Sequence, residues 1–216
     1  MDFMKLIKSL EALLYEVMSW IVFYPRTLFL SVARPLELMQ YADTELDDVD
    51  EDRYSDTLSP PIFLALTLGL AHLVELSHGW EQLEGILADE RNLIAFRLVA
   101  FALIPLMFSV RLLKLQNVAL DRNTLRPPFY AQCFIAAPFA LVVDLGAIFA
   151  RDVPLVAGIG IIAAIARLLA VQTRWFMANG QLSIGRAMWQ AVRAFVTALA
   201  LIVALSMSMT ALSAAA

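Results

Sequence analysis

The sequence contains little cysteine, histidine or charge. With a single cysteine, Cys133, an intrachain disulfide is excluded, and we expect this residue to be structural filler in an apolar stretch. Charged residues make up 17% of the chain and the formal net charge is −4, so nothing favours nucleic acid as a partner. No phosphate-binding G-x-x-x-x-G-K, nucleophile elbow or dinucleotide fingerprint occurs. We therefore expect a protein that is not an enzyme and that needs no cofactor.

Apolar residues are abundant instead, at 61% of the chain with a mean hydropathy of +0.73. A bilayer-spanning helix needs about 20 apolar residues, and helices satisfy their own backbone polar groups in lipid. Five stretches approach this length: Pro61–Ser77, Leu93–Val110, Tyr130–Ala150, Pro154–Val171 and Met188–Leu212. The predicted fold class is all-α: a polytopic membrane helix bundle with five transmembrane helices.

Residues 1–41 are predicted to form amphipathic helices that lie in the membrane interface. Pro25 is expected to end the first helix and Thr27 to begin a second, with a bend near Arg34 before Pro35. Apolar residues recur at helical spacing in the first helix: Phe3, Leu6, Ile7, Leu10, Leu14, Val17 and Ile21.

Residues 42–59 are predicted to be an acidic linker before the transmembrane domain of residues 60–216. Eight acidic residues occur in the fourteen positions from Asp43 to Asp56. Mutual repulsion and the lack of apolar area favour a mobile, solvated segment. The alternative is a docking site for a basic partner, formed by Asp47, Asp48, Asp50, Glu51 and Asp52.

The basic residues alternate between the segments that connect the apolar stretches. They are frequent before the first stretch, in the second loop and in the fourth loop, and scarce elsewhere: Lys5, Lys8, Arg26, Arg34 and Arg53, then Arg111, Lys114, Arg122 and Arg126, then Arg174 and Arg186. The positive-inside rule assigns these segments to the cytoplasm. Five crossings then predict a cytoplasmic N-terminus and a C-terminus outside.

Ionisable residues within three of the apolar stretches form a predicted intramembrane polar cluster. At 1.5 Å per residue, Arg97 and Asp144 have the same depth, on the outer side. We expect them to form a structural ion pair, with Glu75 and His72 partly among the headgroups. The alternative is a small polar cavity for an ion, a proton or a headgroup. The pattern His72-x-x-Glu75-x-x-His78 differs from the H-E-x-x-H zinc motif, so no metal site is predicted.

Three stretches resemble the Yip family of five-crossing membrane proteins, named for interaction with Rab-type GTPases and widespread in bacteria. They are FYPRTLFLSVARP (Phe23–Pro35), FYAQCFIAAPFALV (Phe129–Val142) and TRWFMANGQLSIGRAM (Thr173–Met188). The resemblance covers most of the chain. It implies a membrane-embedded organiser or adaptor without catalytic residues, in a bacterial inner membrane.

Two classes of function follow from these features. The first is a non-enzymatic organiser, adaptor or assembly subunit, whose partners are the lipid bilayer and either other membrane proteins or a second copy of the chain. The second is a small channel or transporter component with its polar cluster near the outer side. A pore needs polar residues along one helix face, whereas the inner and middle parts of the spans are almost entirely apolar. The sequence also lacks the internal repeat of many transporters, which favours the organiser.

Overall fold

Every secondary-structure element in the described part of the chain is a helix. The computed structural model describes residues 3–46, 54, 56–78 and 89–215. The helices are α1 (Phe3–Ala33), α2 (Pro35–Glu45), α3 (Pro60–Ser77), α4 (Glu90–Leu115), α5 (Arg122–Phe149), α6 (Pro154–Gly180) and α7 (Ile184–Ala215). Five of them, α3 to α7, are long and apolar enough to cross a membrane. The all-α bundle is confirmed, and these helices indicate an integral membrane protein.

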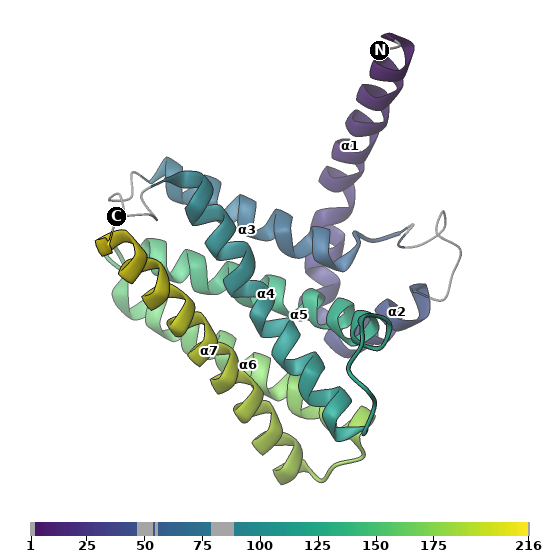
Figure 1. Cartoon of the computed structure of the whole chain (residues 1–216), viewed down its shortest axis with the longest axis vertical. Helices are drawn as coiled ribbons and strands as arrows, with labels where there is room; N and C mark the ends of the chain where they lie inside the picture. Colours follow the sequence, from purple (N-terminus) through teal and green to yellow (C-terminus); the bar gives the residue numbers. More distant parts are fainter. Residues whose placement is uncertain (1–2, 47–53, 55, 79–88, 216) are drawn as a thin grey trace.

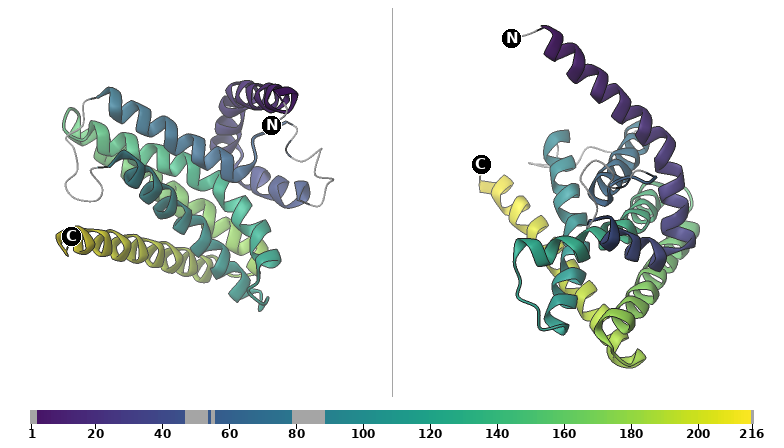
Figure 2. Two further views of the ribbon diagram at one scale, coloured as in Figure 1. Left: turned by 45° about the horizontal axis from the view of Figure 1, so that its top comes forward. Right: turned by 90° about the vertical axis from the view of Figure 1, so that its right-hand side faces the viewer.

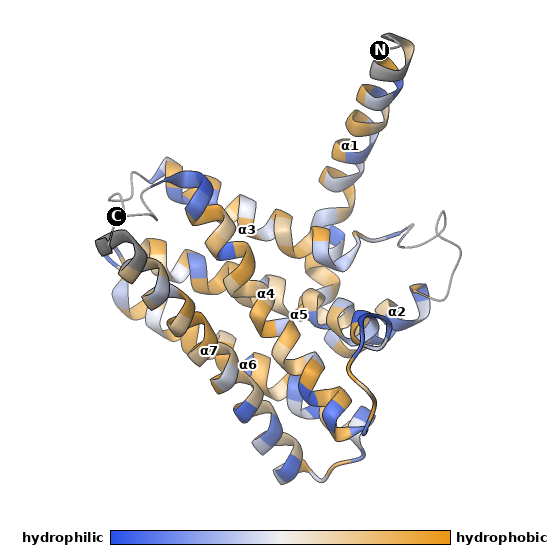
Figure 3. Cartoon of the chain, in the orientation of Figure 1, coloured by the Kyte–Doolittle hydropathy of each residue, from blue (hydrophilic) through white to orange (hydrophobic). Residues whose placement is uncertain are grey.

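The spanning helices run alternately up and down and extend beyond the apolar stretches that predict them. They bundle around α5, which packs against α3, α4 and α6 (Figure 1). Every residue from Ala131 to Ala140 on α5 is buried. Apolar residues cover the spans, and polar ones gather towards helix ends (Figure 3). We call the end where α3, α5 and α7 begin the predicted inner end, because the charge pattern assigns it to the cytoplasm.

Helix α2 belongs to the bundle, which differs from the predicted interfacial position. Leu38, Met39 and Ala42 are buried in the same core as α3 and α5. The helix also continues to Glu45, past the predicted domain boundary at residue 41. The reason is tertiary: an apolar face this short is stabilised by packing against α5.

The expectation that Pro25 ends the first helix is wrong, because α1 continues through Pro25 to Ala33. A proline removes its own N–H donor and its ring clashes with the carbonyl four residues earlier, but a helix can bend there and continue when tertiary contacts hold it. The Thr27 hydroxyl donates to the Phe23 carbonyl at 2.8 Å next to this position. The predicted break at Arg34 is confirmed, because Arg34 has φ −134° and ψ 58° and separates α1 from α2.

The first part of α1 projects away from the bundle, as Figure 1 and both views of Figure 2 show. Its described apolar side chains are exposed, including Leu10 (56%), Leu14 (58%) and Ile21 (63%). These residues belong to the stripe that predicts an amphipathic helix. The described members of the stripe therefore have no cover from the described part of the chain.

The two ends of the predicted acidic linker make specific contacts. A carboxylate oxygen of Glu45 accepts the Tyr54 backbone N–H at 2.6 Å. Asp56 pairs with Arg26 at 2.9 Å and accepts the Tyr41 hydroxyl at 2.5 Å. Burial and the Asp56 carboxylate raise the pKa of Tyr41. The linker is therefore fixed to α1 and α2 at its ends, which differs from the predicted free segment. The five predicted docking acids, Asp47, Asp48, Asp50, Glu51 and Asp52, lie outside the described residues.

Candidate functional site: a buried polar cluster on three helices

Three neighbouring helices bring four ionisable side chains together near the end of the bundle opposite the predicted inner end. His72 and Glu75 lie three residues apart on α3 and therefore share a helix face. Arg97 comes from α4 and Asp144 from α5. Both helices pack against α3. The four residues form the polar cluster.

The strongest contact in the polar cluster is a two-pronged ion pair between Arg97 and Glu75. Nη2 of Arg97 donates to Oε1 of Glu75 at 2.8 Å, and Nη1 lies 2.5 Å from Oε2. Glu75 is 6% exposed at its side chain and Arg97 17%. The planar guanidinium fork matches both carboxylate oxygens, which adds geometric specificity to the charge attraction. The pair therefore joins α3 to α4.

His72 lies against both members of this pair. Its Nδ1 atom is 3.2 Å from Oε2 of Glu75 and 3.4 Å from Nη1 of Arg97. With a proton on Nδ1 the imidazole can donate to Glu75, and without one it can accept from Arg97. The other ring nitrogen, Nε2, is buried and has no hydrogen-bond partner among the described residues. The histidine thus offers one ring nitrogen that the cluster does not use.

Asp144 adds a second carboxylate, which makes no hydrogen bond with Arg97 in the described part of the chain. The residue is 9% exposed, and its Oδ2 atom is buried without a hydrogen-bond partner. Arg97, Glu75 and His72 are close enough to act on it electrostatically. Arg97 therefore forms its ion pair with one carboxylate of the polar cluster, Glu75, and not with the other.

The structure and the sequence-based expectation differ in the residue that pairs with Arg97. We expected an Arg97–Asp144 pair with Glu75 and His72 partly in the headgroups. Arg97 instead binds Glu75, and both Glu75 and His72 are buried, at 5% and 7% exposure. Equal depth along two helices does not determine which faces meet. The i, i+3 spacing of His72 and Glu75 presents both side chains to Arg97 on α4, whereas Asp144 makes no hydrogen bond with Arg97 in the described part of the chain.

The arrangement does not collect metal ligands. The described residues contain no group of three or more His, Cys, Asp or Glu side chains that could hold a metal ion. His78, the last residue of the H-x-x-E-x-x-H pattern, is directed elsewhere: its Nε2 lies 3.5 Å from Asp152, and its ring contacts Phe149 edge-on. What the polar cluster can do chemically is bind helices together and hold or release a proton.

Two further polar contacts within the spans were missed by the sequence analysis. The amides of Gln132 on α5 and Gln172 on α6 donate to each other, with Nε2 of Gln132 at 3.0 Å from Oε1 of Gln172. Arg111 on α4 donates from Nε to Oε1 of Gln190 on α7 at 2.7 Å. Glutamines inside apolar helices at matching depth were the available signal, since hydrogen bonds between spans are a known means of association.

A third contact joins α6 to the end of α1. Nη2 of Arg167 donates to the backbone carbonyls of Ser31 and Val32, each at 2.8 Å. These carbonyls belong to the last turn of α1, where helical partners are missing. The last turn of α1 has no basic residue of its own. Arg167 thus supplies the cap from another helix.

A comparison of the chain with protein-family models, curated proteins and solved structures finds no match. The resemblance to the Yip family therefore stays a hypothesis, and the function is argued from the contacts described above.

Proposed function

We propose that this chain is a non-enzymatic organiser of membrane complexes, an adaptor or assembly subunit of the Yip type in a bacterial inner membrane. The observation that carries the proposal is the projecting part of α1. A helix that leaves its own bundle with an uncovered apolar stripe needs a cover, and the bilayer interface or a partner helix supplies one.

The fixed end of α1 lies next to the ends of the acidic linker. Asp56 contacts Arg26 on α1, and the Leu58 backbone N–H donates to the Thr27 hydroxyl at 3.2 Å. The fixed end of α1 and the described C-terminal end of the linker therefore lie together on the bundle. An acidic segment beside an apolar helix is a suitable combination for a membrane partner with a basic cytoplasmic surface.

The polar side chains within the spans also support this proposal. Arg97 is engaged by Glu75, Gln132 by Gln172 and Arg111 by Gln190. Each contact joins two helices and uses up hydrogen-bonding groups that a polar pathway would need. Such contacts hold a bundle in one arrangement.

The orientation that the proposal requires has its own test. A reporter fused after Ala216 is expected to read outside, and one inserted between Leu112 and Arg126 is expected to read inside, because the basic loops stay in the cytoplasm. Paired alkaline phosphatase and fluorescent protein fusions measure this. The opposite reading at either position would overturn the predicted topology.

Neutralising the linker tests the partner. Asp47, Asp48, Asp50, Glu51 and Asp52 are changed to Asn or Gln, while Glu45 and Asp56 are kept because they hold the linker ends. We expect the variant to insert and fold normally but to lose its partner in affinity capture from native membranes. Wild-type capture should weaken as salt rises, since exposed charges are screened over about 8 Å at physiological ionic strength.

A control that neutralises acids in another loop separates docking from a general effect of acidity. Glu81, Glu84 and Glu90 are changed to Gln in the first loop, which is predicted to face the other side of the membrane. This variant should keep every partner. Capture that is unchanged in the linker variant would show that the linker is only a solvated connection.

The alternative, a small channel or transporter component, has one observation in its favour. Within the described structure, His72 Nε2 and Asp144 Oδ2 are buried without hydrogen-bond partners beside the Arg97–Glu75 pair. Unused polar atoms at one depth could take up and release a proton. Proton flux into liposomes that contain the purified protein distinguishes the two functions, because an organiser gives none. Flux that His72→Phe abolishes, together with the absence of stable partners, would favour the transporter.

A further inference from the structure

A groove runs along one side of the bundle between α4 and the first turns of α5. Its volume is about 880 Å³, within the range of ligand pockets in proteins. The apolar part of the wall consists of Val99, Ala102, Leu103, Leu106, Leu125 and Phe129. The four α4 residues follow i, i+3, i+4, i+7 spacing and therefore form one face of that helix. The groove is an open apolar channel within a predicted membrane span.

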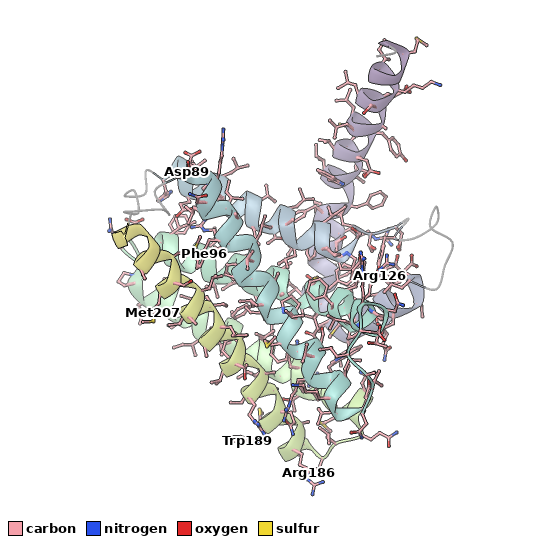
Figure 4. All side chains as sticks on the ribbon, in the orientation of Figure 1. Asp89, Phe96, Arg126, Arg186, Trp189 and Met207 are labelled. Carbon is pink, nitrogen blue, oxygen red and sulfur yellow. The ribbon has the colours of Figure 1, made fainter. Side chains whose placement is uncertain are left out.

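The α5 side of the groove is basic. Arg122, Asn123, Arg126 and Tyr130 line it there, and the Arg126 guanidinium lies 5.2 Å from the centre of the Tyr130 ring. This cation–π contact positions one guanidinium beside the apolar wall. Figure 4 shows Arg126 at the start of α5, next to α4 and well separated from Arg186 at the tip of α7.

The two arginines have no counter-ion in the described part of the chain. No described carboxylate lies within ion-pair distance of Arg122 or Arg126. The nearest acid in the sequence, Asp121, accepts the backbone N–H groups of Asn123 and Thr124 at 2.8 and 2.9 Å. These bonds lower the pKa of Asp121 and keep it ionised as the cap of α5. Two positive charges therefore remain for a ligand.

We propose that this groove binds an anionic phospholipid, with its phosphate held by Arg122 and Arg126 and an acyl chain lying along Val99–Leu106 of α4. The arginines lie at the predicted inner end, where a headgroup of the inner leaflet is located. The apolar face of α4 leads from there towards the middle of the span. Basic pockets next to spanning helices on the cytoplasmic side are suited to anionic headgroups, to which each nearby arginine adds attraction.

Native mass spectrometry of the full chain in detergent tests this proposal. The probes are dioleoyl phosphatidylglycerol and dioleoyl phosphatidylcholine, which have the same acyl chains and differ in net charge. We expect wild-type protein to retain phosphatidylglycerol about tenfold better than phosphatidylcholine. Arg122→Ala/Arg126→Ala should remove this preference, because it removes both charges at the mouth of the groove. Arg122→Lys/Arg126→Lys keeps both charges and should retain most of the preference for phosphatidylglycerol. This variant is the second test if the alanine variant folds poorly.

A matched control removes two arginines elsewhere at the predicted inner end. Arg174 and Arg186 are exposed and do not line the groove, so Arg174→Ala/Arg186→Ala should change the preference less than twofold. Ala102→Trp fills the apolar wall and should weaken retention of phosphatidylglycerol while the arginines are intact. Equal retention of both lipids, equal loss in both double variants or no effect of Ala102→Trp would overturn the site.

A photoreactive amino acid at position 103 identifies the occupant in native membranes. We expect it to label lipid, because Leu103 lies in the apolar wall. Labelling of another protein or of a second copy of the chain instead would show that the groove is a protein interface, which would also overturn the proposal.

Discussion

Replacing Arg97 by leucine is expected to destabilise the bundle by about 3–5 kcal/mol, because it leaves the buried Glu75 carboxylate without its partner. Glu75→Leu should cost less. In that variant Arg97 can turn to the second carboxylate, since its charge already acts on Asp144. The double variant Arg97→Leu/Glu75→Leu should recover most of the loss, because no unpaired charge of the pair remains. Reversible unfolding in mixed micelles measures all three free energies.

Two controls make this double-mutant cycle specific. Arg97→Lys keeps the charge, but an ammonium cannot bridge both carboxylate oxygens, so its stability should be intermediate. The same cycle with Asp144→Leu in place of Glu75→Leu should give a smaller coupling energy, since Asp144 makes no hydrogen bond with Arg97 in the described structure. Additive effects of Arg97→Leu and Glu75→Leu would show that the pair does not stabilise the fold.

The features of the fold that depend on the length of the apolar stretches could be predicted from the sequence. Five stretches of near-bilayer length give five helices, because in lipid no other element satisfies the backbone over such a run. Helix ends were less predictable: α5 begins at Arg122 instead of Tyr130, since polar turns continue a helix beyond the hydrocarbon. The position of α2 on α5 depends on shape complementarity between two particular faces, which a single sequence does not contain.

The site was predictable as a set of residues but not as a set of contacts. Ionisable side chains are costly to place in lipid, so Arg97, Asp144, Glu75 and His72 are unusual within apolar stretches. Their positions along the helices predict that they lie at a similar depth. Which carboxylate meets the guanidinium depends on the rotation of α3 and α5 about their axes. The cap that Arg167 gives to α1 could not be predicted from the sequence, because Arg167 is separated from Ser31 by 136 positions and from Val32 by 135.

Removing the Arg167 cap is expected to have the second large effect, on the local stability of the last turn of α1. Arg167→Leu removes a charged donor from the carbonyls of Ser31 and Val32 at the C-terminal end of the α1 dipole. Hydrogen bonds to charged groups contribute about 1.5–3 kcal/mol each when buried, and Arg167 is only partly buried, so we expect a local loss of about 2 kcal/mol. Amide hydrogen exchange of residues 27–33 should become roughly 30-fold faster.

Arg174 on the same helix provides the matched control for this experiment. Arg174 is exposed, so Arg174→Leu removes the same charge without uncapping α1 and should leave exchange at residues 27–33 unchanged. Arg167→Lys should protect these amides in part, because an ammonium can still approach the two carbonyls. Because the end of α1 is where the projecting helix joins the bundle, loosening it should also reduce capture of the partner that the proposed organiser function requires. Normal exchange in Arg167→Leu would show that the other contacts of α1 hold its last turn without the cap from Arg167.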